Sequence, residues 1–200
     1  SNSNFVPVFE SAESASIDGS FSGDDFFAFL DDNENIESYS VVNTLDVGLG
    51  RFPVQKADEA NALVDKIIHY KSPATLGPWR LNNTYVGHNE DNAGPHLQDA
   101  DDMSMTVDGQ QPIYNDTKVY LDNMNFVSTP GGDRCPDANK AINDQIFKGT
   151  FFVNYSGHGS IYTLAHERIL TSDDFNAWKN TDKLPFFVTA TCDFSRFDDP

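Results

Sequence analysis

A histidine and a cysteine each follow a short apolar segment near the end of the chain. Phe151 to Val153 leads to His158, and Pro185 to Val188 leads to Cys192. Both segments are rich in Phe and Val and bounded by turn residues, which is typical of buried parallel strands. Because functional groups collect at the carboxyl ends of strands in open parallel sheets, we expect His158 and Cys192 to lie at one edge of one sheet.

Such a pair predicts a cysteine nucleophile with its proton partner. The thiolate is the attacking form, and a neighbouring imidazole lowers the thiol pKa and later protonates the leaving group. Gly157 and Gly159 flank His158, so the backbone can turn sharply and leave its N–H groups bare for an oxyanion. A lone histidine is usually a surface residue and a lone cysteine an inert core residue. Their shared position after apolar strands favours catalysis.

A third strand ends in ionisable residues. Leu81 to Gly87 predicts a strand that leads into His88-Asn89-Glu90-Asp91. A site built on cysteine and histidine needs a group that orients the imidazole, usually a carboxylate. We predict Glu90 for this role, with Asp91 as the alternative, while a solvated acidic loop remains the non-catalytic interpretation.

Composition excludes several classes of function. The chain has 200 residues and a formal net charge of −18, from 13 basic and 31 acidic side chains. This charge argues against nucleic acid and against an anionic membrane as binding partners. Its two cysteines allow at most one internal disulfide, and Cys135 lies in a turn-rich segment where we expect a structural or incidental role.

Strands and helices are predicted to alternate along the chain, which indicates an α/β fold with a mainly parallel sheet. The predicted helices are Ala57 to Tyr70, His96 to Met105 and Asp137 to Phe147, and further strands are predicted over Thr44 to Val54, Leu81 to Gly87 and Lys118 to Leu121. Asp137 is expected to cap the third of these helices, and Ser172 or Asp173 is expected to cap a short helix near Phe175 to Lys179.

Three polar groups have weaker functional readings. The acidic run Asp31 to Asn35 suits a hard cation such as Ca²⁺ but lacks the order of ligands of an EF-hand, so a solvated loop is the simpler interpretation. His96 and Asp99 supply only two ligands for a metal, and a solvated polar pair is the simpler interpretation. His166 and Glu167 could face the site, but a surface pair is favoured.

Specific motifs resemble the gingipain family of cysteine peptidases, peptidase family C25. The resemblance rests on NYSGHGS followed by LPFFVTATCDFSRFDDP, and extends to LDVGLGRFPV, ALVDKIIHY, NEDNAGPHLQDAD and AINDQIFKG. It implies a caspase-like domain whose N-terminal portion is residues 24–200, after a leader or loop over residues 1–23. The family's domain continues beyond Pro200, so we expect its C-terminal part to be missing from this chain.

The resemblance also implies site residues and a biological role. The N–H groups of Gly159 and Cys192 would form the oxyanion hole, and His96 stands where Arg-specific gingipains carry an acid that binds the P1 side chain. This departure argues against Arg specificity. The closest likeness is to the peptidases (sortases) that remove C-terminal signal domains from proteins of the type IX secretion system.

From that likeness we expect a protein exported to the outer surface of the outer membrane. Its partners would be C-terminal signal domains, other type IX secretion components and lipopolysaccharide as an acyl acceptor. No cofactor is expected for the reaction, and structural Ca²⁺ stays open because gingipain-like domains carry it. Two alternatives remain: a general secreted gingipain-like protease, and a binding or scaffold domain that has lost the chemistry.

Overall fold

The computed structural model describes residues 6–10, 22–36, 43–89, 94–192 and 194. The chain divides into two compact units, one formed by Lys66–Ser195 and the other by Ser1–Asp65 with Arg196–Pro200. The first unit contains the predicted sheet and the residues after its strands. Within the described residues, none of the helices is both long enough and apolar enough to cross a bilayer.

A four-stranded parallel sheet forms the centre of the larger unit. Its strands lie in the order β10-β7-β3-β4, and every neighbouring pair is parallel. The predicted fold class is therefore confirmed. The strands are β3 (Asn82–Gly87), β4 (Asn115–Tyr120), β7 (Phe152–Ser156) and β10 (Phe186–Ala190).

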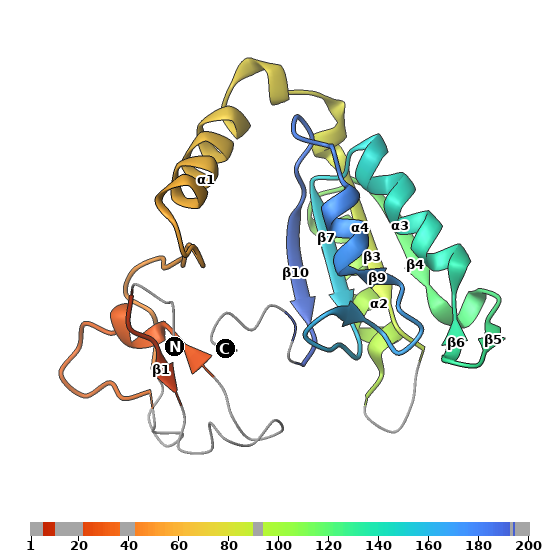
Figure 1. Cartoon of the computed structure of the whole chain (residues 1–200), viewed down its shortest axis with the longest axis horizontal. Helices are drawn as coiled ribbons and strands as arrows, with labels where there is room; N and C mark the ends of the chain where they lie inside the picture. The colour runs from red at the N-terminus through yellow and green to blue at the C-terminus, as the bar shows by residue number, and fades with distance from the viewer. Residues whose placement is uncertain (1–5, 11–21, 37–42, 90–93, 193, 195–200) are drawn as a thin grey trace. The chain divides into compact units, whose positions relative to one another are not determined.

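Helices cover both faces of this sheet. Figure 1 shows α2 (His96–Gln110) on one side and α3 (Pro136–Lys148) with α4 (Ser172–Ala177) on the other. Successive strand residues point to opposite faces, so Tyr85 packs with Ala100 of α2 while Val86 packs with Ile142 of α3. The result is a three-layer α/β/α unit with an apolar core on each side of the sheet.

The order of the strands creates a switch point between β3 and β7. The chain passes from β3 through α2 to β4 on one side, and then returns through α3 to β7 on the other side of β3. Ligand sites in open α/β sheets form at such points, outside the carboxyl ends of the strands. His88 follows β3 and His158 follows β7, so both leave the sheet at this switch point.

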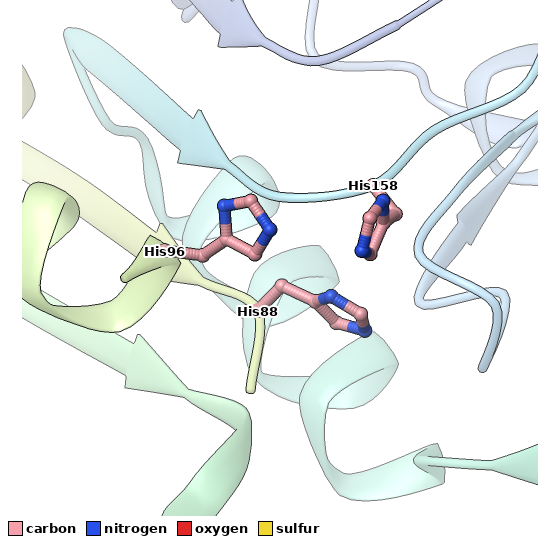
Figure 2. Close-up of side chains that lie close together, drawn as sticks. All are labelled: His88, His96 and His158. Atoms are coloured by element: carbon pink, nitrogen blue, oxygen red, sulfur yellow. The ribbon is translucent and has the colours of Figure 1, made fainter. Parts of the chain in front are cut away.

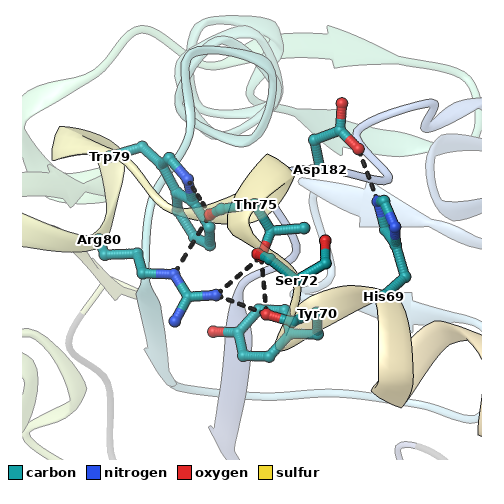
Figure 3. Close-up of polar contacts among 7 residues, drawn as sticks. All are labelled: His69, Tyr70, Ser72, Thr75, Trp79, Arg80 and Asp182. Carbon is teal, nitrogen blue, oxygen red and sulfur yellow. Dashed lines mark hydrogen bonds and ion pairs between the residues drawn. The ribbon is translucent and has the colours of Figure 1, made fainter.

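Hydrogen bonds fix the chain before β3 (Figure 3). Arg80 donates from Nη2 to the carbonyl of Tyr70 at 2.7 Å, and its guanidinium lies 4.4 Å above the Tyr70 ring. The indole of Trp79 donates to the carbonyl of Thr75 at 2.9 Å. These contacts join the end of α1 (Ala57–Tyr70) to two 3₁₀ turns, Pro73–Thr75 and Pro78–Leu81, that lead into the strand.

Short elements complete the described chain. A β5–β6 hairpin lies between β4 and α3. The bounds are β1 Phe9–Glu10, β2 Ser22–Gly23, β5 Val127–Thr129, β6 Gly132–Arg134, β8 Thr163–Leu164, β9 Leu170–Thr171, and 3₁₀ turns Asp25–Phe27 and Leu121–Asn123.

The structure corrects two predicted strands. Residues 44–54 form no strand; Leu45 and Phe52 are about half exposed, because this apolar run has no ladder partner among the described residues. Strand β10 exists as predicted, but it is not buried on both faces. Phe187 packs into the core on the face covered by α3 and α4, whereas Phe186 points to the opposite face. Phe186 is 63% exposed because α2 packs there on β3, β4 and β7, and β10 lies at the edge of the described sheet.

Two predicted helix caps are also wrong. The third helix begins at Pro136 after Cys135, because a proline at the first helical position supplies its fixed φ there, and Asp137 lies inside the helix. The short helix α4 begins after Thr171 rather than Ser172 or Asp173. Thr171 and Asp174 form a capping box, which satisfies two backbone donors at once. By contrast, the helix over Ala57 to Tyr70 is confirmed at both ends.

Asp174 also ties α4 to α3. Its carboxylate accepts hydrogen bonds from Thr171 N at 2.8 Å, Thr171 Oγ1 at 2.9 Å and Asn139 Nδ2 at 3.0 Å. Burial alone would raise the pKa of Asp174, but hydrogen bonds from Asn139, Thr171 and Asn143 outweigh it and hold the pKa below its ordinary value. Asp174 thus anchors the crossover between β7 and β10.

We predict that Asp174→Asn lowers the free energy of unfolding by about 1 kcal/mol at pH 7 and flattens its dependence on acid pH. The folded-state pKa lies below the unfolded value of about 3.9, so the contribution is present above that value and is lost as pH falls through the folded pKa. Urea unfolding between pH 3 and pH 7 measures this. The exposed neighbour Asp173, as Asp173→Asn, should keep the wild-type pH profile; equal profiles for all three proteins would contradict the prediction.

Candidate functional site

The register of β7 and β10 aligns the predicted nucleophile with its predicted proton partner. Ser156 of β7 is the Cα partner of Ala190 of β10. His158 and Cys192 each lie two residues beyond this last pair, so they occupy equivalent positions after two neighbouring strands of the same sheet. The N–H of Gly157 also donates to the carbonyl of Ala190 at 3.2 Å, which extends the pairing past the strand ends.

Gly159 packs directly against the segment that carries Cys192. A Cβ atom on Gly159 would lie 2.4 Å from Thr191 Oγ1 and 3.1 Å from the carbonyl oxygen of Cys192. Only glycine fits at this distance. The glycine after His158 therefore permits a close approach between the two chain segments.

The backbone of His158 is held by two donors. Its carbonyl accepts a hydrogen bond from the Tyr155 hydroxyl at 2.5 Å and another from the Ala165 N–H at 2.8 Å. Tyr155 is 1% exposed, so the hydroxyl that holds His158 is itself fixed in the core. The imidazole of His158 thus projects from a fixed point while its side chain remains half-buried.

The two cysteines differ in exposure. Cys192 is exposed, whereas Cys135 is 1% exposed and packs in the core beneath α3. Burial raises the pKa of the Cys135 thiol, which makes it a poor nucleophile at neutral pH. Both thiols are free. Cys135, for which a structural or incidental role is expected, therefore lies in the core.

Glu90 and its alternative Asp91 lie outside the described residues. A different carboxylate, that of Glu167, accepts a hydrogen bond from Nε2 of His88 at 2.8 Å. Glu167 was predicted as half of a surface pair, but its side chain is only 12% exposed because it contacts this buried histidine.

Four histidines gather at the switch point. The ring of His158 lies 5.0 Å from that of His96, 5.4 Å from that of His88 and 5.0 Å from that of His166, measured between centroids. Figure 2 shows the rings of His88, His96 and His158 around a common space, coming from the end of β3, the start of α2 and the end of β7.

The sequence predicts no role for His88 and a surface position for His166. His166 is exposed as predicted, yet it borders the site. The position of His88 could have indicated a site residue, because it directly follows β3 much as His158 follows β7. His96 lies close to His88 and His158, and Asp99 is an exposed residue in the first turn of α2.

His88 is the buried member of the group. It is 1% exposed, and its Nδ1 has no hydrogen-bond partner among the described residues. Burial lowers the pKa of His88 and outweighs the opposite effect of the hydrogen bond to Glu167, so the ring is neutral at pH 7. A carboxylate can only accept, so Nε2 carries the proton and Nδ1 keeps its lone pair. Gly157 makes room for this ring, because a Cβ there would lie 2.4 Å from His88 Cβ.

Solved structures of gingipains share this fold. The chain matches the crystal structure of the Arg-specific cysteine proteinase gingipain R (RgpB) with a TM-score of 0.60 and 22% identity, over 76% of this chain and 33% of that one. It matches the complex of the Porphyromonas gingivalis RgpB pro- and mature domains with a TM-score of 0.52 and 19% identity, over 68% of this chain and 30% of that one. The chain thus spans about a third of the length of these proteins.

No curated protein sequence matches the chain significantly. The model of peptidase family C25, however, matches it over residues 1–200. This match includes both strand ends that carry the histidine and the cysteine, and it agrees with the gingipain-like arrangement of the sheet. The chain belongs to peptidase family C25.

Proposed function

We propose that this chain supplies the nucleophile and the proton partner of a cysteine peptidase. One observation carries the proposal: β7 and β10 are parallel neighbours whose register brings His158 and Cys192 to equivalent positions past the strand ends. The close packing of Gly159 against Thr191 and Cys192 supports it further. Membership of peptidase family C25 agrees with this chemistry.

In the proposed reaction, the Cys192 thiolate attacks the carbonyl carbon of a peptide bond. A carbon–sulfur bond forms, the carbon–nitrogen bond breaks, and His158 gives its proton to the departing amine. Water or another amine then attacks the thioester carbon, and His158 accepts a proton from it. The carbon–sulfur bond breaks, which releases the acyl product and restores the Cys192 thiolate. The N–H groups of Gly159 and Cys192 are the proposed oxyanion donors, and Glu90 is the proposed orienting group for His158.

A more specific role is proposed from the sequence motifs alone. The chain resembles PorU, so we propose that it removes C-terminal signal domains from proteins of the type IX secretion system at the outer membrane. The acyl group would pass to water or to an amine of lipopolysaccharide, with other secretion components as partners. His96, whose ring lies 5.0 Å from that of His158, is the proposed substrate-binding residue near the scissile bond. The proposed chemistry needs no cofactor, and Ca²⁺ is proposed only as a structural ion, with no site assigned to it.

Limiting alkylation tests whether Cys192 is activated. We expect iodoacetamide at pH 6 to label Cys192 at least about tenfold faster than Cys135, because Cys135 is buried and burial raises the pKa of its thiol, and each unit of pKa changes the thiolate fraction by about that factor. Peptide mapping by mass spectrometry gives the rate at each cysteine. His158→Ala should slow labelling of Cys192 without changing that of Cys135.

The matched control is His69→Ala, a histidine on α1 that pairs with Asp182 (Figure 3). This variant should label Cys192 at the wild-type rate. Labelling of Cys192 that is slow and indifferent to His158 would contradict the peptidase proposal and favour a scaffold domain.

Gly159→Ala should disable the site while leaving the fold intact. Its Cβ would overlap Thr191 Oγ1, so the segments carrying His158 and Cys192 must separate. A displacement of about 1 Å can cost about 100-fold in rate, so labelling of Cys192 should fall to the level of His158→Ala. Gly109→Ala on α2, where a Cβ meets nothing within 4 Å, is the control and should label normally. Wild-type labelling in Gly159→Ala would show that the close approach is unimportant.

Product analysis tests the more specific role. The substrate is a secreted protein fused to a C-terminal signal domain. It is incubated with the peptidase and a small primary amine, and the masses of the products are determined by mass spectrometry. Transfer adds the amine to the new C-terminus, whereas hydrolysis adds water. We expect signal-domain removal that Cys192→Ala abolishes. Cleavage of unrelated peptides at equal rates would instead support a general protease.

A further inference from the structure

The histidines of the switch point have the arrangement of a metal site. Within the described residues, one ligand atom from each of His88, His96 and His158 lies within 4.8 Å of the other two. The three come from different elements, so the tertiary structure assembles the group (Figure 2). Figure 2 shows nitrogen atoms of the rings facing the space that they enclose.

The distances suit a small tetrahedral ion after modest side-chain rotation. Zn²⁺ binds imidazole nitrogen at about 2.0–2.1 Å, which places two ligands of a tetrahedron about 3.4 Å apart. Small rotations of the half-buried His96 and His158 side chains would bring the ligand atoms from their present separation of up to 4.8 Å to this spacing. His88 is buried and held by Glu167, and it provides the fixed point.

His88 shows the second feature of a metal ligand. Its Nε2–H is donated to the carboxylate of Glu167 at 2.8 Å, while its buried Nδ1 has no hydrogen-bond partner among the described residues. Metal-binding histidines nearly always donate their other N–H to a carboxylate or carbonyl, which fixes the ring and its tautomer. A buried polar atom without a partner is costly, and a metal ion would satisfy it.

The donor set selects the kind of ion. Three imidazole nitrogens suit Zn²⁺ and related transition metals, whereas Ca²⁺ and Mg²⁺ require oxygen ligands. A net charge of −18 attracts divalent cations to the protein in general. A site with three protein ligands leaves one tetrahedral position for water or substrate.

We propose that His88, His96 and His158 bind Zn²⁺, and that the bound ion holds the peptidase site in an inactive state. The metal site follows from geometry alone, while its inhibitory effect rests on the proposed role of His158. A ring nitrogen that coordinates Zn²⁺ has no lone pair for a proton, so His158 cannot serve both functions. When the metal is removed, the lone pair of His158 is available again, and His158 can act as the proton partner of Cys192.

Metal binding is tested without any peptidase activity. Full-chain protein carrying Cys192→Ala is titrated with Zn²⁺ against a chromogenic chelator, and with Co²⁺ as a spectroscopic substitute. We expect one strong site per chain and the visible absorption of tetrahedral Co²⁺. Loss of the carboxylate that accepts a hydrogen bond from a metal-binding histidine typically costs about 10–100-fold in affinity, so Glu167→Gln should weaken binding about tenfold or more. Loss of a ligand costs more, so His96→Ala should weaken binding about 100-fold or more.

Controls separate the site from adventitious binding. His69→Ala removes an exposed histidine outside the group and should bind Zn²⁺ like the parent protein. His96 is half-buried at the start of α2, so His96→Ala should still fold, and circular dichroism verifies this. Equal Zn²⁺ affinity in the folded His96→Ala, Glu167→Gln and His69→Ala variants would overturn the metal site.

The inhibitory effect is tested by alkylation with and without Zn²⁺. Zn²⁺ should slow iodoacetamide labelling of Cys192 in the wild-type protein to the rate of metal-free His158→Ala, and a chelator should reverse this. In His96→Ala, Zn²⁺ should have no such effect, which excludes direct binding to the thiol. If Zn²⁺ binds as expected but leaves labelling unchanged, the inhibitory effect is overturned. If metal-free His158→Ala labels like the wild type, the failure lies in the proposed function instead.

Discussion

The close packing of backbone at the carboxyl end of β7 is the constraint on which the site depends. Gly157 and Gly159 flank His158, and neither has room for a Cβ atom. Gly157 packs against His88 after β3, and Gly159 packs against Thr191 beside Cys192. Tyr155 and Ala165 then fix the carbonyl of His158 between them. One short segment therefore sets the distance from His158 to both of its neighbours in the sheet.

This central position gives His158 two sets of neighbours. On one side β10 leads to Cys192, and on the other β3 and α2 supply His88 and His96. A thiol beside an imidazole supports nucleophilic chemistry, whereas three imidazoles together favour a transition metal. The same ring cannot take part in both at once. The parallel order β10-β7-β3 is what makes the two compete.

The burial of His88 distinguishes it from the half-buried His96 and His158 and the exposed His166 around it. An imidazole removed from water must satisfy both of its nitrogens or lose stability. Glu167 satisfies Nε2 from the crossover between β7 and β10. Gingipain R shares the fold over about a third of its length, but at 22% identity that similarity does not extend to individual side chains. The histidine group is therefore described from the residues of this chain alone.

Local patterns in the sequence determined the secondary structure where the signals are strong. The apolar spacing of Ala57 to Tyr70 fixed both ends of a helix, and the Phe- and Val-rich segments gave β7 and β10 with His158 and Cys192 at their ends. Family motifs then identified peptidase family C25. The pattern failed over residues 44–54, because an apolar run becomes a strand only where a neighbour offers its hydrogen bonds.

Tertiary structure alone decided which distant residues meet. No spacing in the sequence relates His88 to His158, or Glu167 to His88, because these contacts depend on the order of the strands and on which crossover packs beside which strand end. The tertiary structure also decided which side chains are exposed. Phe186 of β10 is exposed and Glu167 is nearly buried beside His88, and neither follows from the local sequence. The sequence by itself determined the reactive side chains and the elements that carry them. The packed sheet decided their neighbours, because burial and proximity are properties of the assembled layers and not of any one segment.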